Sequence, residues 1–149
     1  MKVLALLSAL GPAAMAFSPA AAVPRFGLRA ASSTARNMIT ITDGVEFDTI
    51  AREWRCKWSP DDEKASLASA QKALDEVVAD IKAVDGVKSV SRTVCGGCLD
   101  FKVCAQVEAD KFGSWEEGGF APEESFVAKL KGIDGISQIE TQTFTIMDC

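Results

Sequence analysis

The chain has 149 residues, of which 48% are hydrophobic, and its formal net charge is −5. This length supports one modest hydrophobic core, so we expect a single folded domain. The sequence contains no histidine, which excludes imidazole bases, Ser-His-Asp triads and His-ligated zinc sites.

The N-terminal region predicts a targeting leader in two parts. The range 1–16 has a basic start, an apolar run and a small-residue end, like a signal peptide cleaved after Ala16. The range 17–42 contains Arg, Ser and Ala but no acid, which is typical of a disordered transit peptide. Removing this leader lowers the net charge from −5 to −9 because its four basic residues are balanced by no acid. The mature domain, residues 43–149, should therefore avoid nucleic acid and membranes and bind a protein partner with a basic surface.

Around the predicted cleavage point, the sequence Ala16-Phe17-Ser18-Pro19 resembles the bipartite presequences of algae with secondary plastids. The resemblance implies that the mature protein is located in the plastid. An ordinary secreted or endomembrane protein with a disordered N-terminus is the alternative.

The folded part is expected to begin with a strand and a long helix. Large apolar residues alternate with polar ones over the range 53–58, which predicts a half-buried strand. Ser59 should cap the next helix, with Pro60 in its first turn and the acids 61–63 near the positive end of its dipole. The apolar face of this helix should be made of Leu67, Ala70, Leu74, Val77, Val78, Ile81 and Val84.

A hairpin is expected to follow this helix. Gly86 should end the helix, and a strand should run over residues 87–94. The Gly pair in Cys95-Gly96-Gly97-Cys98 is typical of a tight turn, and the alternation over 99–107 predicts the second strand.

The C-terminal third is expected to hold a loop, a helix and a last strand. The range 110–120 is rich in Gly and charge and should be a loop. A helix should begin at Pro122, and the last strand should run over 136–147. The inward face of that helix should be made of Phe126, Val127 and Leu130.

The resulting order β-α-β-β-α-β predicts an α+β fold of the ferredoxin-like type. In this sandwich an antiparallel sheet carries both helices on one face. The sequence 81–90, which contains a helix end, an Asp-Gly turn and a strand start, returns in similar form at 130–139. Such an internal repeat is expected of two similar halves packed side by side.

From Lys57 onward the chain resembles the guanine nucleotide exchange domain of the elongation factor 1 beta and delta subunits. The residues 57–63, Lys-Trp-Ser-Pro-Asp-Asp-Glu, are similar to the start of that family's first helix, and the residues 94–103 to its central hairpin. The resemblance implies a domain that binds a translation GTPase through its C-terminal strand, at Phe144, Thr145, Ile146 and Met147. Ile146 stands where the family has the Lys that helps to release GDP, so we expect protein binding without exchange activity. No catalytic residue, cofactor or resident metal is expected.

The cysteines leave a second hypothesis open. The chain has five cysteines, an odd number, so they cannot all pair within one chain. Cys95 and Cys98 have the CxxC spacing and Cys104 follows on the next strand, which makes a thiol redox or metal-handling role the alternative function. A distance of about 20 Å along an extended strand separates Cys98 from Cys104, which argues against one shared metal ion. The third interpretation is that Cys95 and Cys98 only flank a turn and that Cys56 is a small core residue.

Overall fold

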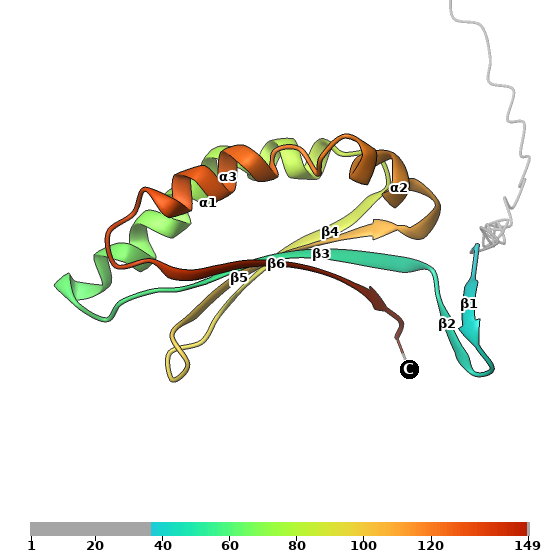
Figure 1. Cartoon of the computed structure of the whole chain (residues 1–149), viewed down its shortest axis with the longest axis horizontal. Helices are drawn as coiled ribbons and strands as arrows, with labels where there is room; N and C mark the ends of the chain where they lie inside the picture. Colours follow the sequence, from blue (N-terminus) through green and yellow to red (C-terminus); the bar gives the residue numbers. More distant parts are fainter. Residues whose placement is uncertain (1–36, 149) are drawn as a thin grey trace, which may run out of the picture. The chain divides into compact units, whose positions relative to one another are not determined.

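Four strands form an antiparallel sheet in the order β4-β5-β3-β6 (Figure 1). This computed structural model describes residues 37–148. Its elements in chain order are β1 (Ile39–Thr42), β2 (Val45–Phe47), β3 (Thr49–Lys57), the short helix η1 (Asp62–Lys64), α1 (Ala65–Ala83), β4 (Val87–Val94), β5 (Asp100–Glu108), α2 (Ala109–Glu117), α3 (Glu123–Lys131) and β6 (Ser137–Ile146). The helices cover one face of the sheet (Figure 1). The predicted ferredoxin-like α+β fold is therefore confirmed.

Strand β3 is one of the two inner strands of the sheet. It pairs with β5 over its whole length, from Thr49 opposite Glu108 to Lys57 opposite Asp100. On its other side it pairs with β6, where Thr49 lies opposite Ile146. Because side chains alternate along a strand, the residues of β3 and its extension that face the helices are Ile50, Arg52, Trp54, Cys56 and Trp58.

The core lies between this face of the sheet and the helices. In the predicted inward stripe, Phe101, Val103, Ala105 and Val107 are buried, and Leu99, which precedes β5, is partly buried against the same cluster. The predicted apolar face of α1 supplies Ala70, Leu74, Val77 and Ile81, while Leu67, Val78 and Val84 are partly buried and pack against the same cluster. Periodicity therefore identified both sides of the core correctly.

The start of the first helix differs from the prediction. Helix α1 begins at Ala65, after a 3-10 turn in which Asp62, Glu63 and Lys64 have positive φ angles. Ser59 does not cap it, because its hydroxyl bonds the Asp61 carboxylate at 2.7 Å. Short polar side chains often bond their own turn in this way, which competes with helix capping.

The segment 110–120, predicted as a loop, instead contains helix α2. Phe112 and Trp115 are buried on its inner side, and the Trp115 indole donates a hydrogen bond of 2.8 Å to the carbonyl of Ala121. Two aromatic anchors three residues apart stabilise a helical turn that the local Gly and charge content disfavours. The loop prediction was wrong for this reason.

The two Asp-Gly turns of the internal repeat have the same backbone geometry. Gly86 and Gly135 have φ angles of +81° and +82°. Both are closely packed, since a Cβ at Gly86 would lie 2.6 Å from the Cβ of Lys111 and one at Gly135 would lie 3.2 Å from those of Ser59 and Ser66. Only glycine fits these positions without strain.

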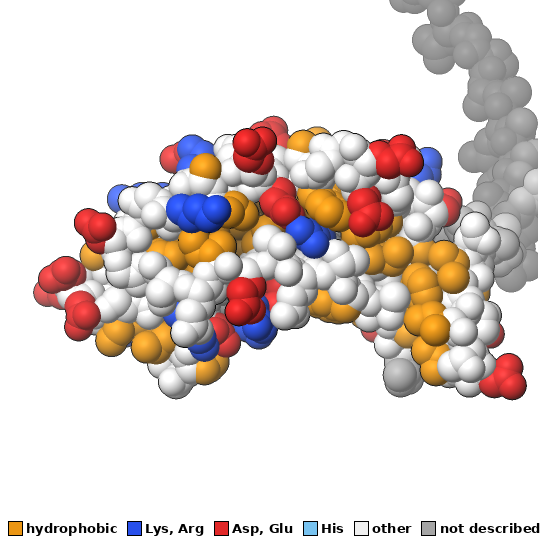
Figure 2. Space-filling model, viewed as in Figure 1, with side chains coloured by type: hydrophobic (Ala, Val, Ile, Leu, Met, Phe, Trp, Pro, Cys, Tyr) orange, Lys and Arg blue, Asp and Glu red, His pale blue; other side chains and the backbone are white. Residues whose placement is uncertain are grey.

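The hairpin of β1 and β2 precedes the sheet. Strand β1 occupies residues 39–42, the end of the range 17–42 that we predicted to be disordered. Ile39, Ile41 and Val45 are exposed on the hairpin, and Figure 2 shows the resulting hydrophobic surface over these strands. The signal peptide and most of the transit segment lie outside the described residues, so the cleavage sites and the plastid location stay predictions. Over residues 37–148, no helix is long and apolar enough to cross a membrane.

Candidate functional site

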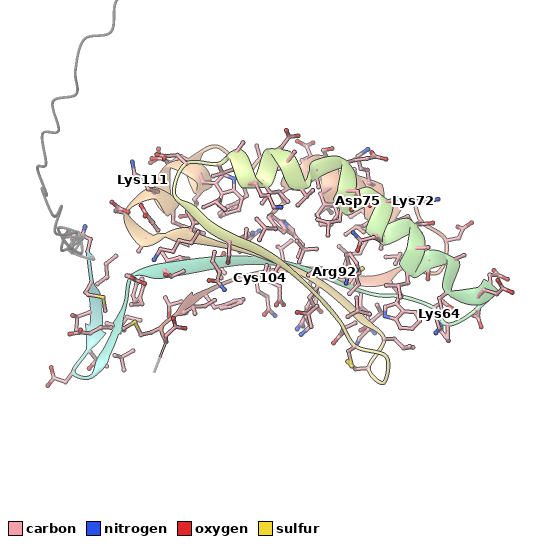
Figure 3. All side chains as sticks on the ribbon, turned by 180° about the vertical axis from the view of Figure 1, so that it is seen from behind. Lys64, Lys72, Asp75, Arg92, Cys104 and Lys111 are labelled. Atoms are coloured by element: carbon pink, nitrogen blue, oxygen red, sulfur yellow. A yellow bond between two sulfur atoms is a disulfide. The ribbon has the colours of Figure 1, made fainter. Side chains whose placement is uncertain are left out.

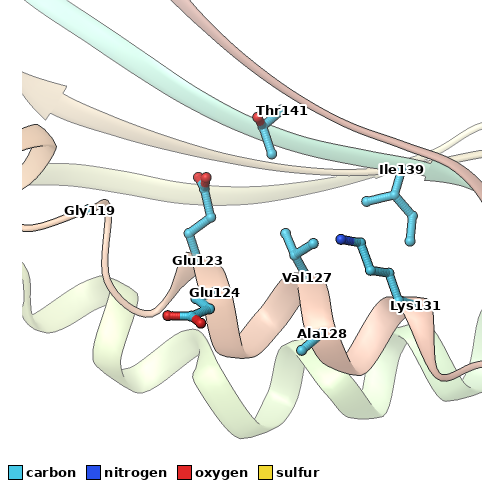
Figure 4. Close-up of a pocket in the computed structure, with 8 residues that line it drawn as sticks. All are labelled: Gly119, Glu123, Glu124, Val127, Ala128, Lys131, Ile139 and Thr141. Carbon is cyan, nitrogen blue, oxygen red and sulfur yellow. The ribbon is translucent and has the colours of Figure 1, made fainter.

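A groove of about 550 Å³ lies between helix α3 and strand β6 (Figure 4). Its volume falls in the range of small-molecule sites. The residues that line it are Gly119, Glu123, Glu124, Val127, Ala128, Lys131, Ile139 and Thr141. In the surface view, hydrophobic side chains between these two elements are flanked by acidic and basic ones (Figure 2). The groove therefore combines an apolar wall with charged groups at its rim.

One end of the groove is closed by an ion pair between β3 and α3. Arg52 donates two hydrogen bonds of 2.8 Å to the two carboxylate oxygens of Glu123. The indole of Trp54 donates a third, also of 2.8 Å, to Oε2 of the same carboxylate. Arg52 reaches β6 as well, through a bond of 3.0 Å from its guanidinium to the hydroxyl of Thr143. One carboxylate thus joins the sheet to the first turn of α3.

The alternation of β3 explains why a charged side chain lies on the inner face. Arg52 is two residues before Trp54 and shares its face, and its neighbour across β5 is the small Ala105. Glu123 stands in the first turn of α3, where a negative charge is favoured by the helix dipole. The bidentate geometry is the strongest that a guanidinium and a carboxylate can adopt.

Aromatic rings support this ion pair from the side of the core. The guanidinium of Arg52 lies 4.2 Å from the ring centre of Phe120, in cation–π geometry. Trp54 packs edge to face on both Trp115 and Phe126, with centroid distances of 6.0 Å. These contacts fix the positions of Arg52 and Glu123.

Lys131 provides the positive charge of the groove. Its side chain extends from α3 towards the gap beneath Ile139, whereas Glu123 points to Thr141 (Figure 4). Over residues 37–148, Lys131 makes no hydrogen bond or ion pair. Lys129, two residues earlier, pairs with Glu76 of α1 instead. Lys131 is therefore the cation available to a ligand in this groove.

The arrangement favours binding over acid–base chemistry by Glu123. Both oxygens of Glu123 accept hydrogen bonds from Arg52 or Trp54, which leaves this carboxylate engaged in structure. The ammonium of Lys131 can bond an anion, and Val127 and Ile139 can contact an apolar ring. Within the described part of the chain, no three His, Cys, Asp or Glu side chains are grouped to hold a metal ion.

The structure separates the cysteines that the sequence singled out. Cys95 and Cys98 form a disulfide at the turn between β4 and β5. Cys104 stays a free thiol on β5, on the face of the sheet away from the helices, between Ser91 and Glu53 of the adjacent strands (Figure 3). The predicted set of Cys95, Cys98 and Cys104 is thus a bonded pair and a separate thiol, rather than one cluster.

The two free thiols of the described residues are poorly disposed to ionise. Burial raises the pKa of Cys56 to about 11, and the charge of Asp100 adds to this effect. Burial also raises the pKa of Cys104, assisted by the charge of Glu53. Because the thiolate is the reactive form, neither residue has the environment of a catalytic nucleophile.

The raised pKa of Cys56 predicts a loss of stability at alkaline pH. The folded-state pKa of about 11 lies above the ordinary value of 9.0, so the unfolded chain releases this proton first. The contribution to stability is therefore complete below pH 9 and is lost as the pH rises from 9 to 11, at up to about 1.4 kcal/mol per pH unit. Urea unfolding measured across this range checks the slope.

A Cys56→Ala variant is the control for this measurement, because other groups titrate over the same range. The free energy of unfolding of the variant should fall less steeply with pH than that of the unchanged protein. Two parallel curves would show that Cys56 keeps an ordinary pKa in the fold.

The C-terminal residues singled out by sequence lie away from the groove floor. Phe144 lies opposite Ala51 in the β3–β6 ladder and is 37% exposed on the open face of the sheet. Ile146 ends β6, and Met147 follows it and is exposed. The partner-binding role of the range 144–147 stays an untested prediction.

Sequence reasoning missed Arg52, Glu123 and Lys131 as a group. Glu123 follows Pro122, where the helix is predicted to begin, and Arg52 lies just before the predicted strand. The available signal was the position of Arg52 two residues before Trp54, which places a charge on an apolar face. A charge in that position requires a partner, because burying it alone is costly.

Comparisons with known proteins show the fold. No family model matches the chain, and no curated protein matches it. A Deinococcus radiodurans protein assigned as an antibiotic biosynthesis monooxygenase superposes with a TM-score of 0.52 at 11% identity, over 67% of this chain and 94% of its own. A Caulobacter crescentus protein with the same assignment gives a TM-score of 0.49 at 14% identity, over 68% and 92%. SnoaB from Streptomyces nogalater, a cofactor-independent oxygenase, gives 0.48 at 14% identity, over 68% and 96%.

These neighbours overturn the resemblance to elongation factor exchange domains. The Deinococcus radiodurans protein carries a monooxygenase assignment, so the predicted kinship and the predicted translation function are wrong. The resemblance depended on the short segments 57–63 and 94–103. In the structure the first runs from the end of β3 into the short helix η1, and the second is a hairpin with a disulfide at its tip. Domains of one fold can carry unrelated functions, so a match over two short segments does not identify the function.

Proposed function

We propose that this domain binds a small aromatic anion in the groove between α3 and β6 and promotes its oxidation by molecular oxygen. The observation that carries the proposal is the ammonium of Lys131, which lacks a partner among residues 37–148 and faces an apolar wall. The fold shared with the Deinococcus radiodurans protein, which is assigned as a monooxygenase, supports the reaction class. A ligand with a flat ring and one acidic group can contact both the apolar wall and the ammonium of Lys131.

The chemistry requires a substrate that supplies its own electrons. In an electron-rich anion such as that of an anthrone, an activated CH₂ group becomes a carbonyl. One atom of O₂ enters the product and the other leaves as water with the two hydrogens, so no further reductant is needed. Lys131 would stabilise the anion, which is the form that gives up electrons to oxygen, and Arg52 and Glu123 would fix the wall of the groove.

The Lys131→Met variant tests the binding part of this proposal. We expect the variant to bind 1-hydroxy-2-naphthoate about ten-fold more weakly, because a charge-assisted hydrogen bond of roughly 1.4 kcal/mol is lost. The neutral 2-naphthol should bind both proteins equally. The measurement is a titration followed by tryptophan fluorescence.

The matched control is Lys129→Met, which removes a cation of the same helix that pairs with Glu76 outside the groove. This variant should bind both probes like the unchanged protein. If the Lys131→Met variant bound the anion as tightly as the unchanged protein does, the proposal would lose its basis.

Oxygen uptake tests the reaction. With 1,8-dihydroxyanthrone, the domain should consume oxygen faster than the spontaneous reaction, and the Lys131→Met variant should show a smaller excess. Binding without any excess uptake would keep the groove as a ligand site and reject the oxygenase step.

A further inference from the structure

The turn between β4 and β5 carries a feature that the groove does not use. Cys95 and Cys98 are joined by a disulfide, with the two glycines Gly96 and Gly97 between them. Lys57 on the neighbouring strand donates a hydrogen bond of 2.7 Å to the carbonyl of Cys98. The disulfide is therefore placed at the end of the hairpin, beside a cation.

The surroundings of this disulfide leave it open to attack. Cys98 is exposed and Cys95 is half-buried. A Cβ built on either Gly96 or Gly97 would meet no atom within 4 Å. An incoming thiolate can therefore approach the sulfur of Cys98, whereas the sulfur of Cys95 is the more protected of the two.

The same geometry prepares Cys95 as a leaving group. The backbone N–H of Cys98 donates a hydrogen bond to the sulfur of Cys95, at 3.1 Å. A hydrogen bond to a sulfur stabilises its negative form, and thiolates that are stabilised leave faster. The sulfur of Cys98 is thus the accessible one, and the sulfur of Cys95 is the better leaving group.

We propose that the Cys95–Cys98 disulfide is a thiol–disulfide exchange site that accepts two electrons from a partner dithiol. A thiolate of the partner attacks the sulfur of Cys98, which forms a mixed disulfide and releases Cys95 as a thiolate that takes up a proton. The second thiol of the partner loses its proton and attacks the partner's first sulfur, which is bonded to Cys98 in the mixed disulfide. Cys98 is released as a thiolate and takes up a proton. Two thiols are formed here and one disulfide in the partner, so electrons and protons balance.

The hairpin is built so that reduction affects only its tip. Below the disulfide, the N–H of Cys95 bonds the carbonyl of Asp100 and the N–H of Trp58 bonds the carbonyl of Leu99, each at 2.9 Å. Lys57 also pairs with Asp100 at 2.6 Å. These contacts do not depend on the disulfide, so the fold should persist when it is opened.

Reduction with dithiothreitol under native conditions tests the exchange. Millimolar dithiothreitol should open the disulfide at a rate proportional to its concentration, while the circular dichroism spectrum stays constant. Labelling with a maleimide should then appear on the tryptic peptide 93–102, which contains both cysteines. A rate that is independent of dithiothreitol concentration, and so limited by unfolding, would overturn the proposal. The proposal would also be overturned if maleimide labelled Cys95 and Cys98 of the air-exposed protein before any dithiothreitol was added.

Glutathione identifies the sulfur that is attacked. Glutathione has a single thiol, and alkylation of the cysteine that it releases traps the mixed disulfide, which fragmentation of the same peptide then locates. We expect at least about ten-fold more adduct on Cys98 than on Cys95, because access controls the attack. Equal adducts, or more on Cys95, would contradict the assigned roles. The Cys104→Ser variant is the control, and its rates should equal those of the unchanged protein.

Discussion

The Glu123→Ala variant should lose about 3 kcal/mol of its free energy of unfolding. The substitution removes the acceptor of three hydrogen bonds, two from Arg52 and one from Trp54. The side chains of Arg52 and Glu123 are only 12% and 20% exposed, so the guanidinium would be left largely buried without its counter-charge. Breaking a buried pair from one side is far more costly than losing a surface one. The midpoint of urea unfolding measures the effect.

Glu124→Ala is the matched control, because it removes the same side chain from the next position of α3. Glu124 is exposed and makes no hydrogen bond or ion pair within the described residues, so its loss should change stability by less than about 0.5 kcal/mol. Glu123→Gln should fall between the two variants, since it keeps one acceptor without the charge. Similar midpoints for Glu123→Ala and Glu124→Ala would mean that the ion pair does not hold α3 to the sheet.

The Phe126→Ala variant should be destabilised by about 3–5 kcal/mol. Phe126 is 1% exposed and packs edge to face on Trp54, the residue that donates to Glu123. Truncation would leave a cavity beneath α3 and free Trp54 to move. Thermal and urea unfolding should both report the loss, and the affinity of the groove for its anionic probe should fall with it.

Phe144→Ala is the control for this effect, as the same truncation on a side chain that is 37% exposed. It should cost about 1–2 kcal/mol, clearly less than Phe126→Ala, because part of the side chain is already exposed and its removal leaves no closed cavity. Comparable losses for the two variants would indicate that the open face of the sheet is covered in solution, and that Phe144 is part of a buried contact.

Much of the fold could be predicted from periodicity and turn residues. The alternation through Phe101, Val103 and Val107 identified β5, and the spacing from Ala70 to Ile81 identified the buried face of α1. Both signals are local, and both arise because one side of each element faces the core. Strand pairing follows from them once the order of elements is known.

The errors occurred where distant contacts decide the local structure. Helix α2 depends on the burial of Phe112 and Trp115 against other parts of the chain, which no local signal reveals. The 3-10 turn before α1 depends on hydrogen bonds among Ser59, Asp61 and Ser66. Such tertiary and turn effects override propensity.

The candidate site was harder to predict than the fold, because its members come from three separate elements. Arg52 and Glu123 are 71 residues apart in the sequence, and they pair only because helix α3 packs over strand β3 in the folded domain. Lys131 looks like an ordinary cation at the end of a helix until β6 is placed beside it. The CxxC spacing did indicate that Cys95 and Cys98 are close, because that relation is local.

The position of β3 between two partners limits how this protein can vary in length. Its residues are paired on both sides from Thr49 to Arg55, so adding one residue there would rotate every later side chain to the opposite face. Arg52 and Trp54 would then lose their hydrogen bonds to Glu123 together, and both ladders would lose their register. Insertions and deletions are therefore tolerated in the connections, such as the tip at Gly96 and Gly97, while the groove can change its chemistry only by substitution.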